Sequence, residues 1–188
     1  MKSMCILLFV VISFIGCDGR EKAYQKNQEV LQKAQLLESF SEQIKFIPEN
    51  YTEIATDTTF SNGLQIKLNY HSLENDYVLK TSKTKQDTII KEHFKNFEVS
   101  LQLFKNESLI TEKTINKHLF SEFIDANFRE EAIMLYVWVD HSSSTEKQVC
   151  LNTAFNIPNT SIFKDFVIYV NDNGSLYVKE LKTTKTTI

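Results

Sequence analysis

The chain has 188 residues, 21 basic and 24 acidic side chains, and a formal net charge of −3 at pH 7. This length suits one domain with a substantial core, and the lack of a basic surplus argues against nucleic acid as a partner. With 14 Phe and 7 Tyr against 4 Gly and 2 Pro, the composition favours β-strands over a loop-rich scaffold.

The first residues are typical of an export signal. Lys2 precedes an apolar run from Met4 to Ile15. This run is too short for a membrane span of about 20 residues and matches the core of a signal peptide. Charged residues follow Cys17 at once, so no stop-transfer pattern is present. We predict that residues 1–16 are a lipoprotein signal peptide that is removed.

The segment Phe14-Ile15-Gly16-Cys17 is typical of a lipobox, in which the chain is cut before the cysteine and the thiol receives a diacylglycerol. The alternative is an ordinary signal-peptidase site with an unmodified Cys17. The lipobox interpretation predicts lipidation at Cys17, with the membrane as a partner. It places the protein in the cell envelope, anchored to the outer membrane and facing the periplasm or the exterior. Acyl chains contribute about 0.8 kcal/mol per buried methylene, so several chains on one cysteine give durable attachment.

Residues 17–48 are predicted to form the lipidated N-terminus and a helical spacer. The stretch 21–45 lacks Gly and Pro, and apolar residues recur every seven positions from Ala23 to Ile44, which predicts one N-terminal amphipathic helix ending before Pro48. The helix either packs on its own domain, which we favour, or lifts the domain off the membrane as a spacer or coiled-coil seam.

Residues 49–181 are predicted to form a single β-rich domain that begins with a hairpin. Apolar and polar residues alternate from Leu64 to Tyr70, which indicates a half-buried strand. A three-residue loop with Gly63 in the left-handed conformation places the apolar residues on one face, whereas a two-residue loop would not. The predicted pairs are Phe60 with Leu64, Thr58 with Ile66, Thr56 with Leu68 and Ile54 with Tyr70.

A second hairpin is predicted near the C-terminus, with the three-residue loop Asp172-Asn173-Gly174. Its predicted pairs are Val170 with Leu176, Ile168 with Val178 and Tyr169 with Tyr177. Further segments lie between the hairpins: strands at 97–103, 109–115 and 149–157, a short helix within 115–124, and a central strand at 133–139 covered on both faces.

This pattern predicts a mainly β fold, an antiparallel β-sandwich or a strongly curved sheet of about 8–9 strands. The polar tail 182–188 is predicted to be frayed.

The search for chemistry identifies no catalytic residues, no metal ligands and no cofactor site. Common nucleophile, zinc and phosphate-binding motifs are absent, and the four histidines are widely spaced. Cys5 leaves with the signal and Cys17 is modified, so Cys150 has no partner and is expected to be a buried apolar residue.

The candidate ligand-binding residues are Trp138, Tyr136 and Phe97. The single tryptophan and its aromatic neighbour either line a ligand pocket or fill the core, and core packing is the simpler interpretation.

Three stretches together resemble a known family. They are the lipobox, the segment Tyr51 to Thr58 leading into Ser61-Asn62-Gly63, and the closing segment Val170 to Gly174. Over roughly residues 17–180 the chain is similar to a family of small Bacteroidetes lipoproteins defined as a domain of unknown function, number 4738. The resemblance implies an envelope location and brings no catalytic residues with it.

We expect a non-enzymatic envelope module that binds a protein, glycan or lipid partner through a sheet face or an edge strand. One alternative is a hydrolase whose carboxylates converge only in the fold, which requires a cleft with at least two acids. Another is a carrier of an apolar ligand, which requires a cavity between the sheets.

Overall fold

The computed structural model describes residues 29, 42–85 and 88–181. The chain forms two compact units, one from residues 1–43 and 83–89 and one from residues 44–82 and 90–188. The second unit contains nearly all of both β-sheets. In the first, the main-chain N–H of Thr84 donates to the oxygen of Thr88, 2.9 Å away. The predicted signal peptide, Cys17 and the tail 182–188 lie outside the described residues.

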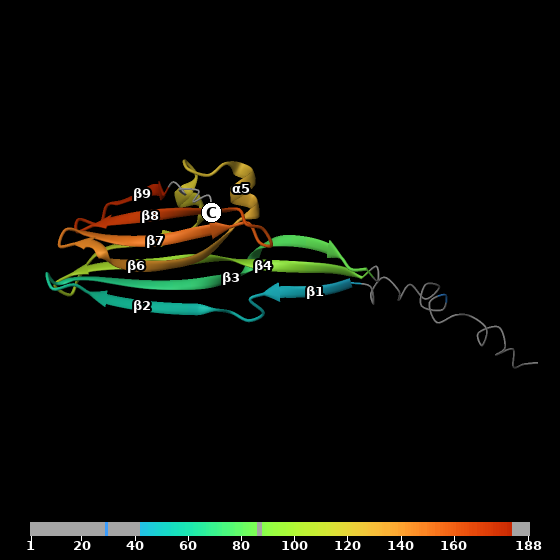
Figure 1. Cartoon of the computed structure of the whole chain (residues 1–188). Helices are drawn as coiled ribbons and strands as arrows, with labels where there is room; N and C mark the ends of the chain where they lie inside the picture. Colours follow the sequence, from blue (N-terminus) through green and yellow to red (C-terminus); the bar gives the residue numbers. More distant parts are fainter. Residues whose placement is uncertain (1–28, 30–41, 86–87, 182–188) are drawn as a thin grey trace, which may run out of the picture. The chain divides into compact units, whose positions relative to one another are not determined.

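Two sheets make up the fold (Figure 1). The five-stranded sheet has the order β1 (Glu42–Ile47), β4 (Ile89–Lys105), β3 (Leu64–Lys83) and β2 (Glu53–Thr59), and β5 (Ser108–Ile115) also pairs with β4. The four-stranded sheet has the order β6 (Ile133–Thr145), β7 (Gln148–Asn156), β8 (Phe163–Asn171) and β9 (Leu176–Leu181). The predicted mainly β fold is therefore confirmed, with two sheets in a sandwich-like arrangement.

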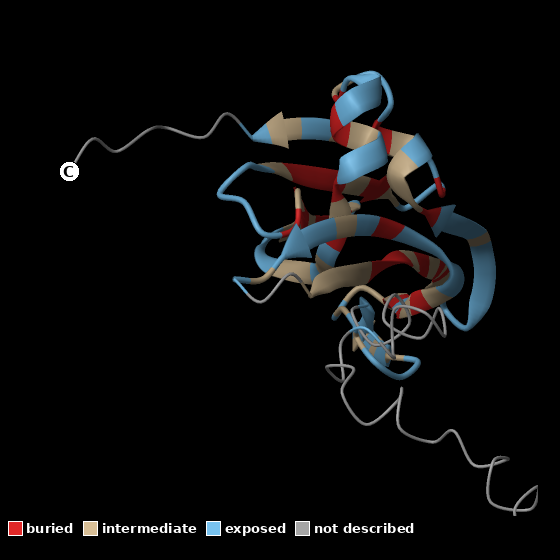
Figure 2. Ribbon diagram, turned by 90° about the vertical axis from the view of Figure 1, so that its right-hand side faces the viewer, coloured by how far each residue is buried: buried red, intermediate tan, exposed pale blue. Residues whose placement is uncertain are grey.

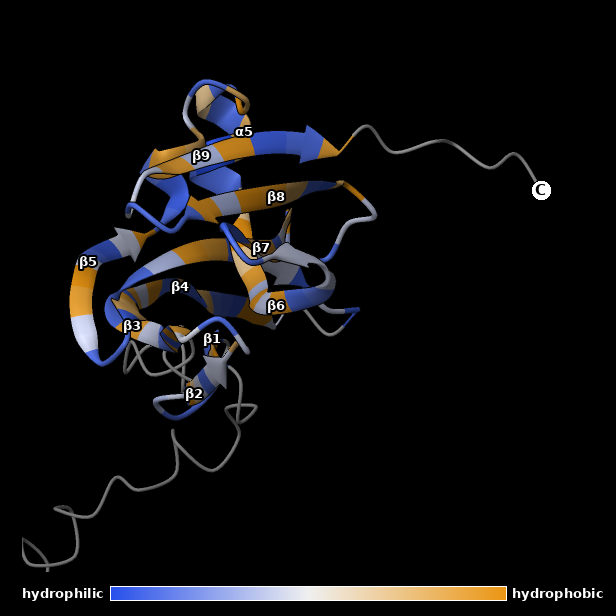
Figure 3. Cartoon of the chain, turned by 90° about the vertical axis from the view of Figure 1, so that its left-hand side faces the viewer, coloured by the Kyte–Doolittle hydropathy of each residue, from blue (hydrophilic) through white to orange (hydrophobic). Residues whose placement is uncertain are grey.

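The core lies between the two sheets, where the buried residues gather (Figure 2). Alternate residues on each strand face inward, as the pleat requires. The inner faces contribute Leu64, Ile66, Leu68, Val99, Leu101 and Leu103 from one sheet and Val149, Leu151, Phe155, Phe166, Ile168 and Val170 from the other. Burying each such side chain contributes about 1.5–3 kcal/mol. In Figure 3 much of β8 is hydrophobic, whereas part of β9 is hydrophilic. The sequence of β9 includes Lys179 and Glu180.

The predicted N-terminal hairpin is confirmed. Thr58 pairs with Ile66, Thr56 with Leu68 and Ile54 with Tyr70. Gly63 adopts a φ of +79°, the left-handed conformation that the three-residue loop demands. Ile54 nevertheless remains exposed, because β2 lies at the edge of its sheet.

The C-terminal hairpin is confirmed as well. The pairs are Val170 with Leu176, Tyr169 with Tyr177 and Ile168 with Val178. Gly174 has a φ of +82°, and its N–H donates to the oxygen of Asn171, 2.9 Å away.

The predicted helix over 21–45 is wrong at its C-terminal end, where Glu42–Ile47 form β1. Its remaining residues, apart from Glu29, lie outside the described part of the chain. Ile44 fits the seven-residue repeat of a helix, and it fits equally well the alternation of a strand in which Phe46 is the next apolar residue. Pairing with β4 then supplies hydrogen bonds that override helix propensity.

The strand at 133–139 was expected to be central, and the structure corrects this. Within the described sheet, β6 is an edge strand and β7 occupies the inner position between β6 and β8. An apolar run does not distinguish a strand covered on both faces from an edge strand that exposes aromatic residues. Trp138, at 53% exposure, is such a residue.

Two short helices connect the sheets, the 3-10 helix η1 (Lys117–Phe120) and α5 (Ala126–Glu131). The predicted helix within 115–124 corresponds to η1 and the turn after it, whereas α5 has no counterpart in the sequence prediction. Both are anchored by buried side chains, Phe120 and Phe128. Within the described residues, no helix combines the length and apolarity required to cross a membrane.

Candidate functional site

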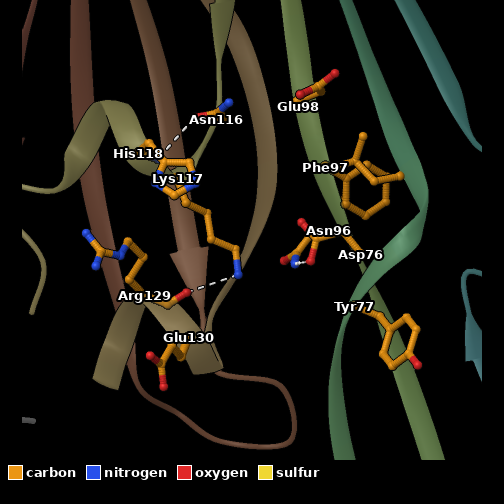
Figure 4. Close-up of a pocket in the computed structure, with 11 residues that line it drawn as sticks. Asp76, Tyr77, Asn96, Phe97, Glu98, Asn116, Lys117, His118, Arg129 and Glu130 are labelled. Atoms are coloured by element: carbon orange, nitrogen blue, oxygen red, sulfur yellow. Dashed lines mark hydrogen bonds between the residues drawn. The ribbon is translucent and has the colours of Figure 1, made fainter. Parts of the chain in front are cut away.

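A cleft of about 460 Å³ lies where β3 and β4 face the η1 and α5 segments (Figure 4). Its volume is in the range of small-molecule binding sites, about 300–1,000 Å³. The lining residues are Leu73, Asp76, Tyr77, Asn96, Phe97, Glu98, Asn116, Lys117, His118, Arg129 and Glu130.

Local capping positions the helical wall of this cleft. The Asn116 side chain accepts a hydrogen bond from the N–H of His118, which starts η1 and places Lys117 at its first position. The Asp125 side chain likewise accepts from the N–H of Phe128, 2.8 Å away, at the start of α5. The caps therefore hold Lys117 and Arg129 on one wall.

The ammonium group of Lys117 extends from this wall toward Asp76 and Asn96 (Figure 4). It donates a hydrogen bond to the main-chain oxygen of Arg129, 3.0 Å away. Burial lowers the pKa of Lys117 from its ordinary value, and the negative charge of Asp76 partly opposes this shift. Lys117 is therefore a cation that has lost part of its hydration.

The opposite wall presents an amide–carboxylate pair. Asn96 is only 4% exposed, and its Nδ2 donates to Oδ1 of Asp76, 2.6 Å away. The Oδ1 atom of Asn96 is buried and has no hydrogen-bond partner among the described residues. An unpaired buried polar atom costs about 1–3 kcal/mol, so this oxygen calls for a donor that the protein does not supply.

Two further carboxylates complete the lining. Glu98 lies 3.3 Å from Nε2 of His71, which forms an ion pair when the histidine is protonated. Glu130 lies on α5, beside Arg129. The arrangement can bind a group that both donates and accepts hydrogen bonds. Among the described residues, no group of three or more His, Cys, Asp or Glu side chains is placed to hold a metal ion.

A family model described as a domain of unknown function, DUF4738, matches residues 20–178. The chain belongs to this family. The match covers the cleft, the strands from β1 to β8 and the first half of β9. No curated protein matches the sequence.

The DUF4738 domain separates the three candidate ligand-binding residues. Phe97 lies in the core, stacked on Tyr70 with ring centroids 4.6 Å apart, and it also lines the cleft. Tyr136 and Trp138 stack on each other, 4.2 Å apart, on β6. Their partners on β7, Ala154 and Asn152, alternate with the core residues of that strand, so both rings face outward.

The expectation that Trp138 fills the core is therefore wrong, and a β-bulge explains the error. Strict alternation puts Met134 on the same side as Tyr136 and Trp138. The β6–β7 register shifts at Leu135, between Met134 and Tyr136. Met134 is consequently buried while the two following aromatic residues turn outward.

The prediction for Cys150 is confirmed. It is a free, buried cysteine, 1% exposed, whose Sγ donates to the oxygen of Ser143, 3.1 Å away. Burial raises the pKa of the thiol, and the charge of Asp140 adds to the shift.

Sequence reasoning missed the other cleft residues of the DUF4738 domain. Asp76, Asn96 and Lys117 lie on separate elements, and none of them belongs to a recognisable motif. The only local signal was Asn116, whose residue type suits a helix cap two positions before His118.

Proposed function

We propose that this protein is a lipid-anchored envelope protein that binds a ligand in the cleft between β3–β4 and the η1–α5 segment, without transforming it. The proposal rests on the buried Oδ1 atom of Asn96, which has no hydrogen-bond partner in the described part of the chain. Lys117, which faces it, has two donors beyond the one used by Arg129. A bound ligand would accept from Lys117, and it would reach the fully buried Oδ1 atom of Asn96 once the side chains that cover this atom shift.

The anchoring part of the proposal is supported by the leader and the lipobox alone, since Cys17 lies outside the described residues. Metabolic labelling with an alkyne-tagged fatty acid tests it. We expect label on the natural chain and on Cys150→Ser, and none on Cys17→Ser. Mass spectrometry is expected to find a mature N-terminus at a diacylated Cys17. An intact leader or a bare Cys17 thiol contradicts the anchoring.

The binding part can be tested without knowing the ligand. Fractionated small molecules and glycans from the envelope are added to the isotope-labelled protein, and amide chemical shifts are recorded. We expect the largest shifts at residues 73–77, 96–98 and 116–118. Saturable shifts confined to other parts of the fold, or no shifts with any fraction, contradict the proposed site.

A carboxylate-based hydrolase is the second candidate, because Asp76, Glu98 and Glu130 line the same cleft. Asp76 and Glu98 are each held by a protein partner, Asn96 and His71, which suits ligand positioning better than proton transfer. Turnover of a chromogenic glycoside or ester that disappears in Glu130→Gln would favour the hydrolase.

A carrier of an apolar ligand fits less well. That function needs Phe97, Tyr136 and Trp138 around one cavity, and the structure places Phe97 in the core and the stacked pair on the outer face of β6.

A further inference from the structure

The charge of the cleft argues against an anionic ligand. Three carboxylates line it, those of Asp76, Glu98 and Glu130, against two cations, Lys117 and Arg129. The excess of negative charge opposes a phosphate or carboxylate group, because like charges repel strongly in a partly dehydrated space. A purely cationic ligand conflicts in turn with the Lys117 ammonium group that points into the gap. A neutral ligand fits both constraints.

The polar groups that face each other demand donors and acceptors in the same small volume. Lys117 needs an acceptor, whereas Asp76 and Oδ1 of Asn96 need donors. The charge of Asp76 affects the pKa of Lys117, so the two side chains are near each other. They are nevertheless too far apart for direct contact, since no salt bridge of 4.0 Å or less joins them within the described residues, and a gap remains between them. A hydroxyl group donates and accepts at one atom, so it can bridge this gap.

Part of the remaining lining is apolar, beside the polar residues Asn116 and His118. Leu73, Tyr77 and Phe97 contribute carbon surface on the strand side of the cleft. The ring of Tyr77 packs against those of His93 and Phe46, with centroids 4.4 Å and 6.4 Å apart, and points away from Lys117 (Figure 4). A ligand with hydroxyl groups along its edge and C–H groups on its faces matches a site that combines polar groups with some carbon surface.

The geometry points to a neutral carbohydrate as the ligand of this cleft, bound through adjacent hydroxyl groups of one sugar ring. This inference rests on the proposed binding function and names its ligand class. One hydroxyl group accepts from Lys117, and its neighbour donates to the Asp76–Asn96 pair. The volume of about 460 Å³ has room for roughly one or two sugar rings.

A peptide is the nearest competitor and fits less well. A trans peptide unit carries one donor and one acceptor, which lie in one rigid plane and point in opposite directions. The cleft offers more acceptors than donors, since each carboxylate accepts several hydrogen bonds. A sugar ring supplies several O–H donors in the volume of one residue, so the hydrogen-bonding capacity of the cleft favours a carbohydrate.

Calorimetric titration of the full mature chain carrying Cys17→Ser tests the inference. The probes are glucose, galactose, mannose, N-acetylglucosamine and their disaccharides, with triglycine and inorganic phosphate as competitors of other chemistry. Lys117→Met keeps the side-chain stem and removes the charge. Lys113→Met is the matched control, because Lys113 is an exposed lysine on β5 and does not line the cleft. Asp76→Asn is a second variant in case Lys117→Met fails to fold, which circular dichroism checks.

We expect saturable binding of at least one sugar, weakened at least about 10-fold by Lys117→Met or Asp76→Asn and unchanged by Lys113→Met. If triglycine or phosphate binds with the same dependence on Lys117 and no sugar does, the carbohydrate inference is wrong while the binding function stands. If no probe binds and the envelope fractions also leave residues 73–77, 96–98 and 116–118 unshifted, both are overturned. If Lys117→Met and Lys113→Met change sugar binding equally, the sugar binds outside the cleft and the inference is overturned.

Discussion

The hydroxyl group of Tyr70 on β3 donates a hydrogen bond to the main-chain oxygen of Leu135 on β6, 3.0 Å away, and its single proton is shared with the oxygen of Met134 at 2.9 Å. Leu135 is the residue at which the β6–β7 register shifts. A bulge takes carbonyl groups out of the regular ladder, and a buried carbonyl needs a donor. Tyr70 supplies that donor from the opposite sheet.

Replacing Tyr70 by Phe is expected to lower the free energy of unfolding by about 1–3 kcal/mol, because the carbonyl groups at the bulge lose their buried donor. The stacking on Phe97 is kept. Urea denaturation measures the change. Tyr169→Phe is the control, since Tyr169 also stacks on a ring, that of Tyr177, and no hydrogen bond of its hydroxyl group is found among the described residues. Equal losses in the two variants would show that the bulge contact contributes nothing specific.

Alkaline pH is expected to destabilise the fold partly through Tyr70. Burial raises the pKa of this hydroxyl group well above its ordinary value, whereas the unfolded chain ionises at about pH 10. Above about pH 10 the unfolded state binds fewer protons than the folded state, so the free energy of unfolding falls as pH rises toward the folded pKa. Below about pH 10 the contribution of Tyr70 to stability is fully present. Measured from about pH 8 to pH 11, the decline should be shallower in Tyr70→Phe. Identical slopes would contradict the assignment.

Gly174→Ala is expected to cost about 2–3 kcal/mol. Its φ of +82° disfavours any side chain, and an added Cβ would lie 2.9 Å from Cβ of Thr111 on β5. Gly63→Ala has a similar φ, but its new methyl group meets the end of the flexible Asn106 side chain, so a cost of about 1–2 kcal/mol is expected. Urea denaturation of both variants tests the order. A larger loss of stability in Gly63→Ala would show that Thr111 on β5 moves away from the added Cβ more easily than Asn106 does, which contradicts the expected order.

Cys150 is expected to react with a thiol reagent on the order of 100-fold more slowly in the folded protein than in urea, because its thiol is buried and its pKa is raised by that burial. The measurement uses a chain without residues 1–17, in which Cys150 is the single cysteine. Ser61→Cys in the same chain provides an exposed thiol that should react rapidly without denaturant. Rapid native reaction at Cys150 would indicate that β6 opens readily over β7.

The two hairpins could be predicted to the residue from the sequence. Each register follows from strict alternation on both sides of a glycine whose turn needs a positive φ, and all of this information is local to about fifteen residues. The sandwich class followed for the same reason, since one-sided strands must bury their apolar faces against another layer. The burial of Cys150 could be predicted because a cysteine without a disulfide partner behaves as a small apolar residue and is usually buried.

Tertiary structure decided what local patterns leave open. The outward position of Trp138 depends on a bulge at Leu135, which the hydroxyl group of Tyr70 in the other sheet stabilises, and no local periodicity reports that contact. The cleft likewise exists only because the η1–α5 connection packs beside β3 and β4, bringing Lys117 opposite Asp76 and Asn96. Alternation and turn chemistry act between near neighbours in the chain, whereas an edge strand, a bulge contact and a binding cleft arise from the packing of distant segments.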